Sequence, residues 1–321
     1  MHAITLNRYG SPDVLQLEEV ERPMCGDDEV LVEVRGASVN PVDWVMMTGE
    51  PYFIRLFFGL LRPKNRVSGR DGAGIVRAVG SDVTHFKPGD EVFGGGNGAF
   101  AQYMCVPEEQ LGPKPANLSF EEAAAVPVAA LTALQGLRKG GLEAGQRVLI
   151  NGASGGVGTF AVQIARSLGA IVTGVCSTRN IEMVSAIGAD HVVDYTQENF
   201  TESGKTYDMV FDLIGNHSFA ACNSVLTPNG TYVLAGVKPK KGVFGPITRM
   251  VHMFAIAPFV GRRMVNIDAK RTREDMLLLS EMLSSGVVKP VIDRTYTFDE
   301  TAEAMRYLGK GHARGKVVIT V

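Results

Sequence analysis

The middle of the chain alternates short apolar runs with stretches of helical length. Between about residues 146 and 237, each apolar run is followed by a helical pattern and then by the next run. This order is typical of a doubly wound parallel sheet. The predicted strands are Arg147–Ile150, Ile171–Cys176, His191–Val193, Met209–Leu213 and Thr231–Leu234.

The first part of the chain, to about residue 115, is instead rich in short strands. Glu29–Arg35 alternates apolar and polar positions, Gly74–Val79 is apolar, and Gly89–Gly94 combines a turn with a strand. These features predict a compact β domain. The chain closes on another apolar strand, Lys316–Thr320. Because such a strand needs a partner, we expect it to pair with the N-terminal β region.

Helix signals mark the boundaries between these parts. Ser119 and Glu122 have the spacing of a capping box, and Pro127 suits the first turn of a renewed helix that runs to about Leu137. We therefore expect an α/β protein. A discontinuous β domain of residues 1–123 and 268–321 is interrupted by a parallel-sheet domain of residues 124–267.

A glycine-rich turn, Gly152–Gly158, directly follows the first predicted strand of the sheet domain. The helix after it, Gly156–Leu168, presents unpaired backbone N–H groups and the positive end of its dipole, which suit a pyrophosphate. A second strand, Ile171–Cys176, completes the strand-helix-strand unit that such a motif requires. The turn therefore predicts a dinucleotide site; the alternative is an ordinary tight turn.

The end of that second strand indicates which dinucleotide is bound. An NAD site usually has an Asp or Glu there for the ribose 2′-hydroxyl. This chain has Ser177, Thr178 and Arg179 instead, which suit a 2′-phosphate. We expect NADPH, although Arg179 has the alternative of being a solvated residue at a helix start.

Composition excludes several classes of function. The 321 residues are 45% hydrophobic, and 32 basic residues balance 34 acidic ones, so nothing draws the chain to nucleic acid. Met1–Leu6 alternates like a strand rather than a signal peptide, and we expect a cytoplasmic protein. Val243–Val260, the most apolar segment, contains prolines and charges and is a poor membrane span; we expect a loop and helix near a pocket or subunit contact.

The cysteines are few and far apart. Their spacing indicates neither a disulfide framework nor a zinc finger, and we expect reduced, buried thiols. They are Cys25, Cys105, Cys176 and Cys222.

Five motifs together resemble a known family, and the resemblance spans essentially the whole chain. The motifs are Ser38–Asp43, Gly69–Gly80, Phe86–Val92, Ala153–Gly158 and Gly311–Val318. They are similar to those of medium-chain dehydrogenases/reductases of the zinc-free quinone oxidoreductase and alkenal/enone reductase branch. The resemblance implies a GroES-like β domain built from both chain ends, a Rossmann domain between them and an active site in the cleft.

The residues at the zinc-ligand positions differ from those of zinc-dependent relatives. Such relatives have a Cys where Asn40 stands and a His-Glu pair where Arg70 and Asp71 stand. The remaining histidines have no ligand spacing. We therefore predict no metal and reject a zinc alcohol dehydrogenase.

Without a Lewis acid, reduction of an activated double bond is easier than oxidation of an alcohol. The resemblance implies that Asn40 lies beside nicotinamide and substrate; alternatively it only caps the turn before Pro41. Tyr52 is expected to donate a hydrogen bond to an enolate or to line the site beside the ring. The alternative is that it only packs against its neighbours. Asp43 is expected to be structural, with a basic partner such as Arg70. Val45 replaces a Lys of many relatives, which puts any role of that Lys in doubt here.

The remaining site residues are expected to bind the cofactor. The resemblance adds Tyr195 to Ser177 and Arg179 as a 2′-phosphate contact, with packing as the alternative. Residues that end two later strands should line the nicotinamide ribose and ring. Lys316 is expected to reach the cofactor, unless it is a solvated charge. The expected cofactor residues are Ala153, Ser154, Gly155, Gly156, Val157, Ser177, Arg179, Tyr195, Leu213, Ile214, Ala235, Gly236 and Lys316.

These expectations define an NADPH-dependent reductase of small apolar enones, alkenals or quinones. The alternative is an NADPH-binding redox sensor or interaction protein with vestigial catalysis. Relatives pair through cofactor-domain sheet edges, so we expect a homodimer and no membrane span. The apolar stretch Pro51–Leu61 favours a bulky apolar substrate, a covering lid or a dimer contact.

Overall fold

The computed structural model describes residues 1–236 and 263–321. The chain folds into two compact units. One unit comprises Met1–Val128 and Lys270–Val321, and the other comprises Ala129–Ala269. We call them the catalytic unit and the cofactor unit, after the roles expected from the sequence. The segment Val243–Val260, for which a loop and helix were expected, lies outside the described residues.

The catalytic unit is built on a seven-stranded sheet. Its path has the order β14-β15-β3-β4-β5-β7, with β6 also paired to β3, and a separate hairpin is formed by β1 and β2. The strands are β1 (His2–Leu6), β2 (Leu15–Glu19), β3 (Glu29–Val39), β4 (Asp71–Val79), β5 (Glu91–Gly94), β6 (Tyr103–Pro107), β7 (Leu111–Pro113), β14 (Ile292–Thr297) and β15 (Lys316–Thr320). The helices are α1 (Pro41–Thr48), α2 (Arg55–Phe58), α3 (Phe120–Ala124), α9 (Arg273–Ser284) and α10 (Thr301–Gly309), while α4 (Pro127–Gly140) continues into the cofactor unit.

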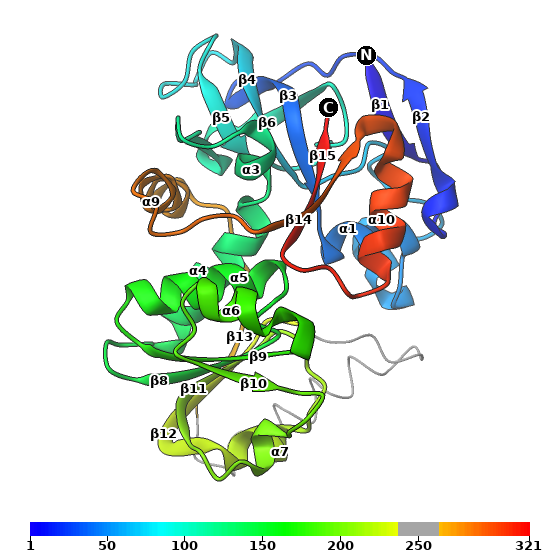
Figure 1. The fold of residues 1–321 in the computed structure, drawn as a ribbon. Helices are drawn as coiled ribbons and strands as arrows, with labels where there is room; N and C mark the ends of the chain where they lie inside the picture. The colour runs from blue at the N-terminus through cyan, green and yellow to red at the C-terminus, as the bar shows by residue number, and fades with distance from the viewer. Residues whose placement is uncertain (237–262) are drawn as a thin grey trace. The chain divides into compact units, whose positions relative to one another are not determined.

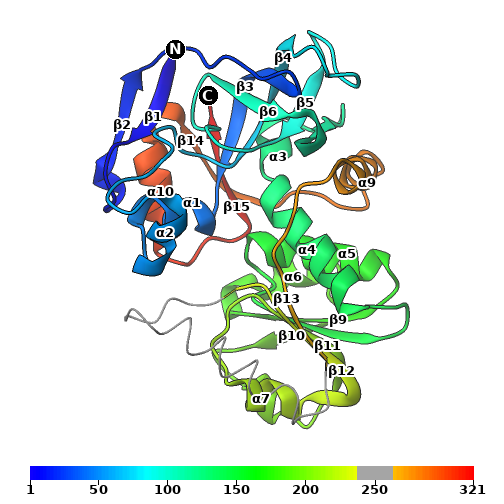
Figure 2. The ribbon, with the colours of Figure 1, turned by 180° about the vertical axis from the view of Figure 1, so that it is seen from behind.

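The closing strand pairs with the N-terminal β region, as the sequence predicts. β15 lies antiparallel to β3, with Val317 opposite Val39 and Thr320 opposite Gly36. The apolar side chains of these strands share one buried cluster with Met305 of α10, which packs beside β14 and β15 in Figures 1 and 2. Burial of this cluster joins the two chain ends into one core.

The cofactor unit has six parallel strands in the order β10-β9-β8-β11-β12-β13. When these strands are numbered from 1 along the chain, the order becomes 3-2-1-4-5-6, which is that of a Rossmann sheet. This order confirms the expected doubly wound fold. Helices α5 and α6 lie on one face and α7 on the other (Figure 1). The elements are β8 (Arg147–Asn151), α5 (Gly156–Ser167), β9 (Ile171–Cys176), α6 (Ile181–Ala186), β10 (His191–Asp194), β11 (Tyr207–Asp212), α7 (Phe219–Ser224), β12 (Leu226–Leu234) and β13 (Arg263–Asn266).

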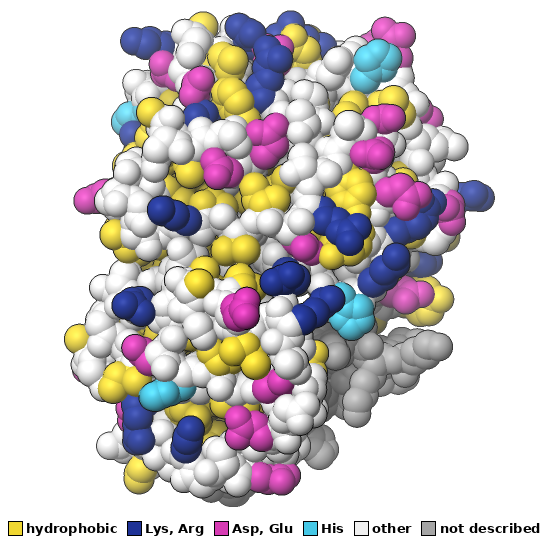
Figure 3. Space-filling model, in the orientation of Figure 1, with side chains coloured by type: hydrophobic (Ala, Val, Ile, Leu, Met, Phe, Trp, Pro, Cys, Tyr) yellow, Lys and Arg dark blue, Asp and Glu magenta, His cyan; other side chains and the backbone are white. Residues whose placement is uncertain are grey.

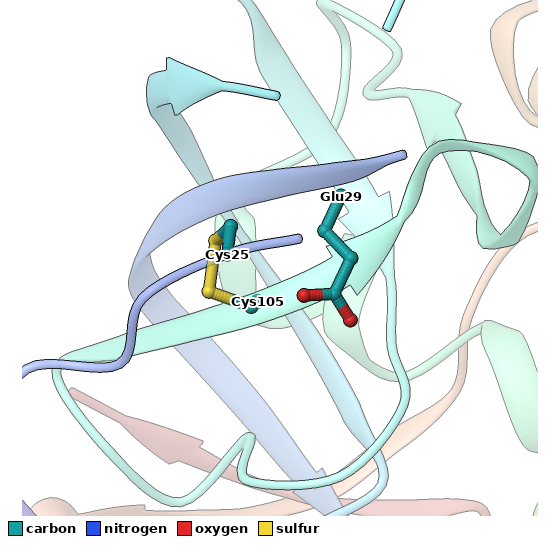
Figure 4. A group of neighbouring side chains, drawn as sticks. All are labelled: Cys25, Glu29 and Cys105. Atoms are coloured by element: carbon teal, nitrogen blue, oxygen red, sulfur yellow. A yellow bond between two sulfur atoms is a disulfide. The ribbon is translucent and has the colours of Figure 1, made fainter. Parts of the chain in front are cut away.

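The expectation of four reduced, buried cysteines is wrong for two of them. Cys25 and Cys105 form a disulfide across 80 residues, and both are half-buried beside Glu29 (Figure 4). The strand pairing of β3 with β6 brings them together, which spacing along the chain does not reveal. Cys176 and Cys222 are free and buried, as expected.

The surface and the helices are consistent with the composition. On the face drawn in Figure 3, acidic and basic side chains are interspersed. Among the described helices, none combines the length and the apolar character needed to cross a membrane.

Candidate functional site

Asn40 stands between β3 and α1, and its side chain is almost completely buried at 1% exposure. Its Nδ2 donates to Oδ2 of Asp71 at 3.0 Å and to the Ser38 carbonyl oxygen at 3.3 Å. Its Oδ1 accepts a hydrogen bond from Nζ of Lys316. Both N–H groups of the amide are therefore engaged inside the catalytic unit.

The turn-capping alternative for Asn40 also holds in part. Asn40 is the N-cap residue of α1, and Oδ2 of Asp43 accepts its backbone N–H at 2.8 Å. This is the returning half of a capping box, with the acidic side chain at the third helical position. Capping is thus performed by Asp43, which leaves the Asn40 amide to Asp71 and Lys316.

Lys316, at the start of β15, is only 3% exposed. The solvated-charge alternative is therefore wrong. Burial lowers the pKa of Lys316, while the carboxylates of Asp71 and Asp43 act in the opposite direction. A buried ammonium is retained only beside acceptors and opposite charges, and here Asn40 and these carboxylates provide them.

Asp71 links three distant segments of the catalytic unit. It is fully buried, accepts the N–H of Val128 at 3.0 Å and forms an ion pair of 2.9 Å with Arg271. The expected contact between Asp43 and Arg70 is not an ion pair in the described parts of the chain; Arg70 donates to Asn97 at 2.7 Å. The ion-pair partner of Asp71 is Arg271, which the sequence motifs did not indicate.

Asp43 is the most perturbed acid of the unit. Burial, followed by repulsion from Asp71, raises the pKa of its carboxyl to about 7. Its Oδ1 has no hydrogen-bond partner among the described residues. Asp43 also lines a small pocket of about 110 Å³. The other residues of this pocket are Leu6, Met46, Phe57, Phe58, Pro63, Lys64, Asn65, Val67, Ser68 and Gly69.

The second expected catalytic residue, Tyr52, is 54% exposed, and the guanidinium of Arg55 lies 4.7 Å from its ring centre. Its hydroxyl therefore belongs to the surface of the catalytic unit rather than to the buried cluster. The neighbouring apolar side chains of Leu56, Phe57 and Leu61 are also exposed.

The donor set around Asn40 does not fit a catalytic zinc. Such a site needs about three thiolate, imidazole or carboxylate ligands. Here the three positions hold an amide, a guanidinium and a carboxylate, and the cations of Lys316 and Arg271 already contact the amide and the carboxylate. The chemistry of this cluster is that of hydrogen bonding and proton supply.

In the cofactor unit, the glycine turn has the features that phosphate binding requires. Gly152 has φ +94°, a conformation that favours glycine. A Cβ on Gly158 would come within 2.1 Å of the Gly152 carbonyl oxygen, whereas a Cβ on Gly155, the N-cap of α5, would meet nothing closer than 3.5 Å. Gly158 thus closes the turn, and Gly155 leaves open space at the helix N-terminus for a pyrophosphate.

The residues at the end of β9 form a polar cluster. Asn180 donates to the hydroxyls of Ser154 at 3.0 Å and Ser177 at 3.2 Å, so the glycine turn and the expected 2′-phosphate residue are joined by one amide. Arg179 and Tyr195 are exposed. The Tyr195 backbone N–H donates to the Cys176 carbonyl oxygen at 3.0 Å, which holds Tyr195 next to the end of β9.

Sequence reasoning missed one carboxylate here. Asp194 ends β10 opposite Cys176 of β9, and it accepts hydrogen bonds from the hydroxyls of Thr178 and Thr196. The bond from Thr178, together with the other bonds, lowers the pKa of Asp194. A search confined to the end of β9 cannot find a carboxylate that the neighbouring strand supplies.

The expected ring-side residues lie together at the carboxyl ends of β11 and β12. Oδ1 of Asp212 accepts the N–H groups of Ile214 at 3.1 Å and Gly215 at 2.8 Å, and Oδ2 accepts the Tyr232 hydroxyl at 2.6 Å. A Cβ on Gly236 would lie 2.0 Å from the Leu213 carbonyl oxygen. Leu213, Ile214, Ala235 and Gly236 thus form one edge at the carboxyl ends of β11 and β12, beside the switch point between β8 and β11 where such folds bind ligands.

Comparisons with known proteins agree with this architecture. Residues 26–116 match the model of the alcohol dehydrogenase GroES-like domain, and residues 187–319 match that of a zinc-binding dehydrogenase domain. The 2-methylene-furan-3-one reductase of Solanum lycopersicum is 36% identical over 99% of this chain and 79% of its own. The chloroplastic NADPH-dependent alkenal/one oxidoreductase of Arabidopsis thaliana is 34% identical with the same coverage.

A solved structure shares the whole fold. The quinone oxidoreductase from Coxiella burnetii has a TM-score of 0.88 and 29% identity over 100% of this chain and 99% of its own. A Rossmann unit inside a discontinuous β unit defines a two-unit oxidoreductase of the dinucleotide-binding class. The chain belongs to the medium-chain dehydrogenase/reductase superfamily, in its zinc-free quinone and alkenal/enone oxidoreductase branch.

Proposed function

We propose that this protein is a zinc-independent, NADPH-dependent reductase of the activated double bond of α,β-unsaturated carbonyl compounds or of quinones. The observation that carries the proposal is the contact of Lys316 and Arg271 with Asn40 and Asp71, at two of the positions where zinc-dependent relatives hold metal. Bound NADPH supplies the hydride, and the protein supplies orientation, hydrogen bonds and a proton.

In this proposal, Asn40 acts on the carbonyl oxygen or on the cofactor carboxamide by exchanging one hydrogen bond. The bond to the Ser38 carbonyl at 3.3 Å is the longer of the two made by Nδ2, so a ligand oxygen replaces it at the lowest cost. Lys316 and Asp71 hold the amide in place meanwhile. Tyr52 is the proposed hydroxyl donor. Its side chain is 54% exposed and therefore accessible to a substrate.

The pocket beside Asp43 is the proposed site for the apolar part of the substrate. Met46, Phe57 and Phe58 provide apolar walls, and Asp43 provides one carboxyl. A ligand with an apolar body and a carbonyl oxygen matches this lining, as do the alkenal/one and quinone substrates that relatives carry in their names.

The preference for NADPH over NADH rests on Ser177, Arg179 and Tyr195. A hydroxyl and a guanidinium favour a 2′-phosphate. The Asp194 carboxylate nearby is engaged by Thr178 and Thr196, which reduces its repulsion of the phosphate.

The remaining proposals concern the location and the oligomeric state of the protein. We propose a cytoplasmic homodimer, and light scattering of the purified chain tests its mass. The alternative of a catalytically silent redox sensor, which the Val45 replacement keeps open, has less support, because relatives are named as reductases and oxidoreductases.

The deciding experiment is NADPH oxidation, followed at 340 nm, by the EDTA-treated protein with a short-chain enone, a long-chain 2-alkenal and a quinone. We expect turnover and a saturated carbonyl product from the first two. NADPH binding without turnover of any of the three would favour the sensor instead.

The cofactor preference is tested with Arg179→Ala. We expect its KM for NADPH to rise about 10- to 150-fold, because a charge-assisted hydrogen bond is lost, and its KM for NADH to stay the same. Arg166→Ala, on α5, is the matched control. Equal effects on the two cofactors would contradict a 2′-phosphate contact.

A further inference from the structure

Three side chains with metal-binding atoms meet on the catalytic unit, apart from the cluster around Asn40. Cys25 precedes β3, Glu29 is the first residue of β3, and Cys105 lies on β6. Their two sulfurs and a carboxylate oxygen all lie within 4.8 Å of one another, and the Glu29 carboxylate points toward Cys105 in Figure 4. All three residues are half-buried, so solutes reach them from the solvent.

Backbone hydrogen bonds hold Cys105 and the turn that follows Cys25 independently of the disulfide. Cys105 lies opposite Leu31 in the pairing of β6 with β3. Near Cys25, the Glu29 N–H donates to the Gly26 carbonyl oxygen at 3.2 Å. Reduction of the disulfide therefore leaves two thiols on neighbouring segments whose Cα atoms are 5.3 Å apart.

The Glu29 carboxylate is oriented for a third contact. Its Oε2 accepts the Gly26 N–H at 2.9 Å. Within residues 1–236 and 263–321, no hydrogen bond or ion pair is made by its Oε1. One oxygen thus orients the group, and the other stays available as a ligand, an arrangement common around protein-bound metals.

We propose that the reduced protein binds one zinc-like divalent cation through the thiolates of Cys25 and Cys105 and the carboxylate of Glu29. Two thiolates and a carboxylate are ligands that zinc accepts, and water completes the tetrahedron. The disulfide and the metal are alternative links between the same two segments. The site is separate from the proposed reductase site.

The change between the two states balances with a named reductant. A phosphine such as TCEP transfers two electrons to the disulfide and becomes a phosphine oxide, while one water supplies the oxygen and the two thiol protons. Zinc binding then releases these protons as the thiolates coordinate.

The test uses the full chain, treated with TCEP or left oxidised, and freed of metal. Each form is titrated with zinc chloride in competition with a chromogenic chelator. We expect about one zinc per reduced chain and none per oxidised chain. We also expect zinc to raise the Tm of the reduced form only, because it binds the folded state.

Variants separate this site from general zinc binding. Cys105→Ser should lose the zinc, and Glu29→Gln should weaken binding about tenfold or more. Asp27→Asn, an exposed carboxylate of the same loop, is the matched control and should bind like the wild type. If Cys105→Ser does not fold, a comparison of the zinc affinities of Glu29→Gln and Asp27→Asn still tests the proposal. The proposal would be overturned if the reduced wild type, Cys105→Ser and Glu29→Gln had the same zinc affinity, or if none of them bound zinc. The test does not depend on reductase activity.

Discussion

Asp43 combines three properties that are rarely found together in one carboxyl. It closes the first turn of α1, it has an oxygen without a partner among the described residues, and it lines a pocket of otherwise mostly apolar walls. Burial that raises its pKa to about 7 means that its proton is held over most of the acidic range. Asp43 thus makes the structural contact at the start of α1, and its raised pKa places a titratable carboxyl beside the proposed substrate pocket.

This raised pKa predicts a pH-dependent stability. The folded chain holds the Asp43 proton up to about pH 7, whereas an unfolded Asp releases it near pH 3.9. The unfavourable contribution of Asp43 to folding hence grows from about pH 4 to about pH 7 and is constant above.

The variant Asp43→Asn has no such proton. Its Tm relative to the wild type should therefore increase between pH 4.5 and pH 7.5, as measured by thermal unfolding in a pH series. Parallel Tm curves for the two proteins would show that the carboxyl does not titrate in this range.

Lys316 permits a second residue-scale prediction. Lys316→Met removes the donor to the Asn40 amide and leaves Asp71 and Asp43 with less compensating charge. We expect kcat/KM for an enone to fall about 100-fold, the range of a misplaced substrate-positioning group, because the Asn40 amide loses the contact that orients it. Lys310→Met, at an exposed position, is the control, and equal activities of the two variants would remove Lys316 from the site.

At this scale, the sequence identified most members of the buried cluster but not their partners. Asn40 and Lys316 stood in recognisable motifs. Their contact joins residues 276 positions apart, and the ion pair of Arg271 with Asp71 spans 200. Pattern reasoning is local, so it predicts residues more readily than the non-local bonds between them.

At the scale of elements, the turn between β8 and α5 separates a packing role from a binding role. Gly158→Ala places a Cβ 2.1 Å from the Gly152 carbonyl oxygen, a backbone atom that has little room to move. Gly155→Ala meets no atom closer than 3.5 Å but fills the space at the N-terminus of α5.

Gly158→Ala should therefore change stability, whereas Gly155→Ala should change cofactor binding. Gly158→Ala should lower the free energy of unfolding by about 1–3 kcal/mol, the usual cost of overpacking. Gly155→Ala should keep its stability and bind NADPH more weakly. Denaturant unfolding and fluorescence titration measure the two quantities, and a stable Gly158→Ala variant would contradict the proposed close packing.

The elements themselves were largely predictable where their patterns were strong. The strands from Arg147 to Leu234 and the closing strand were found because their apolar runs are continuous. The short β13 was not found because only two of its four residues, Met264 and Val265, are apolar. Asp194 was overlooked at the cofactor end because it reaches β9 from the adjacent strand, a relationship set by sheet order and not by spacing.

For the whole molecule, the pairing of β15 between β14 and β3 makes the chain end part of the catalytic core. Removal of Lys316–Val321 should expose the edges of β14 and β3 and the apolar side chains, such as Ala37 and Val39, that share a buried cluster with Val317 and Ile319. We expect trypsin to cleave residues 1–128 and 270–315 rapidly while most of residues 129–269 remain protected. Uniform protection of the truncated chain would show that the closing strand is dispensable.

The two-unit architecture followed from the sequence because each unit has its own periodicity. The disulfide did not, since Cys25 and Cys105 meet only through the register of β3 and β6. The disulfide depends on which strands become neighbours in the sheet. Composition and spacing along the chain do not reveal that pairing.

The route of the chain also sets an order of events at the ribosome. The first 128 residues emerge early, but Val39 of β3 waits for Lys316 and Val317, some 277 positions later. The cofactor unit is continuous in sequence and so can fold during translation, whereas the nascent catalytic unit carries an unpaired strand edge until Lys316–Thr320 has been synthesised. Synthesis of the closing strand β15 is thus the step that ends the exposure of this sheet edge to chaperones, proteases and other nascent chains.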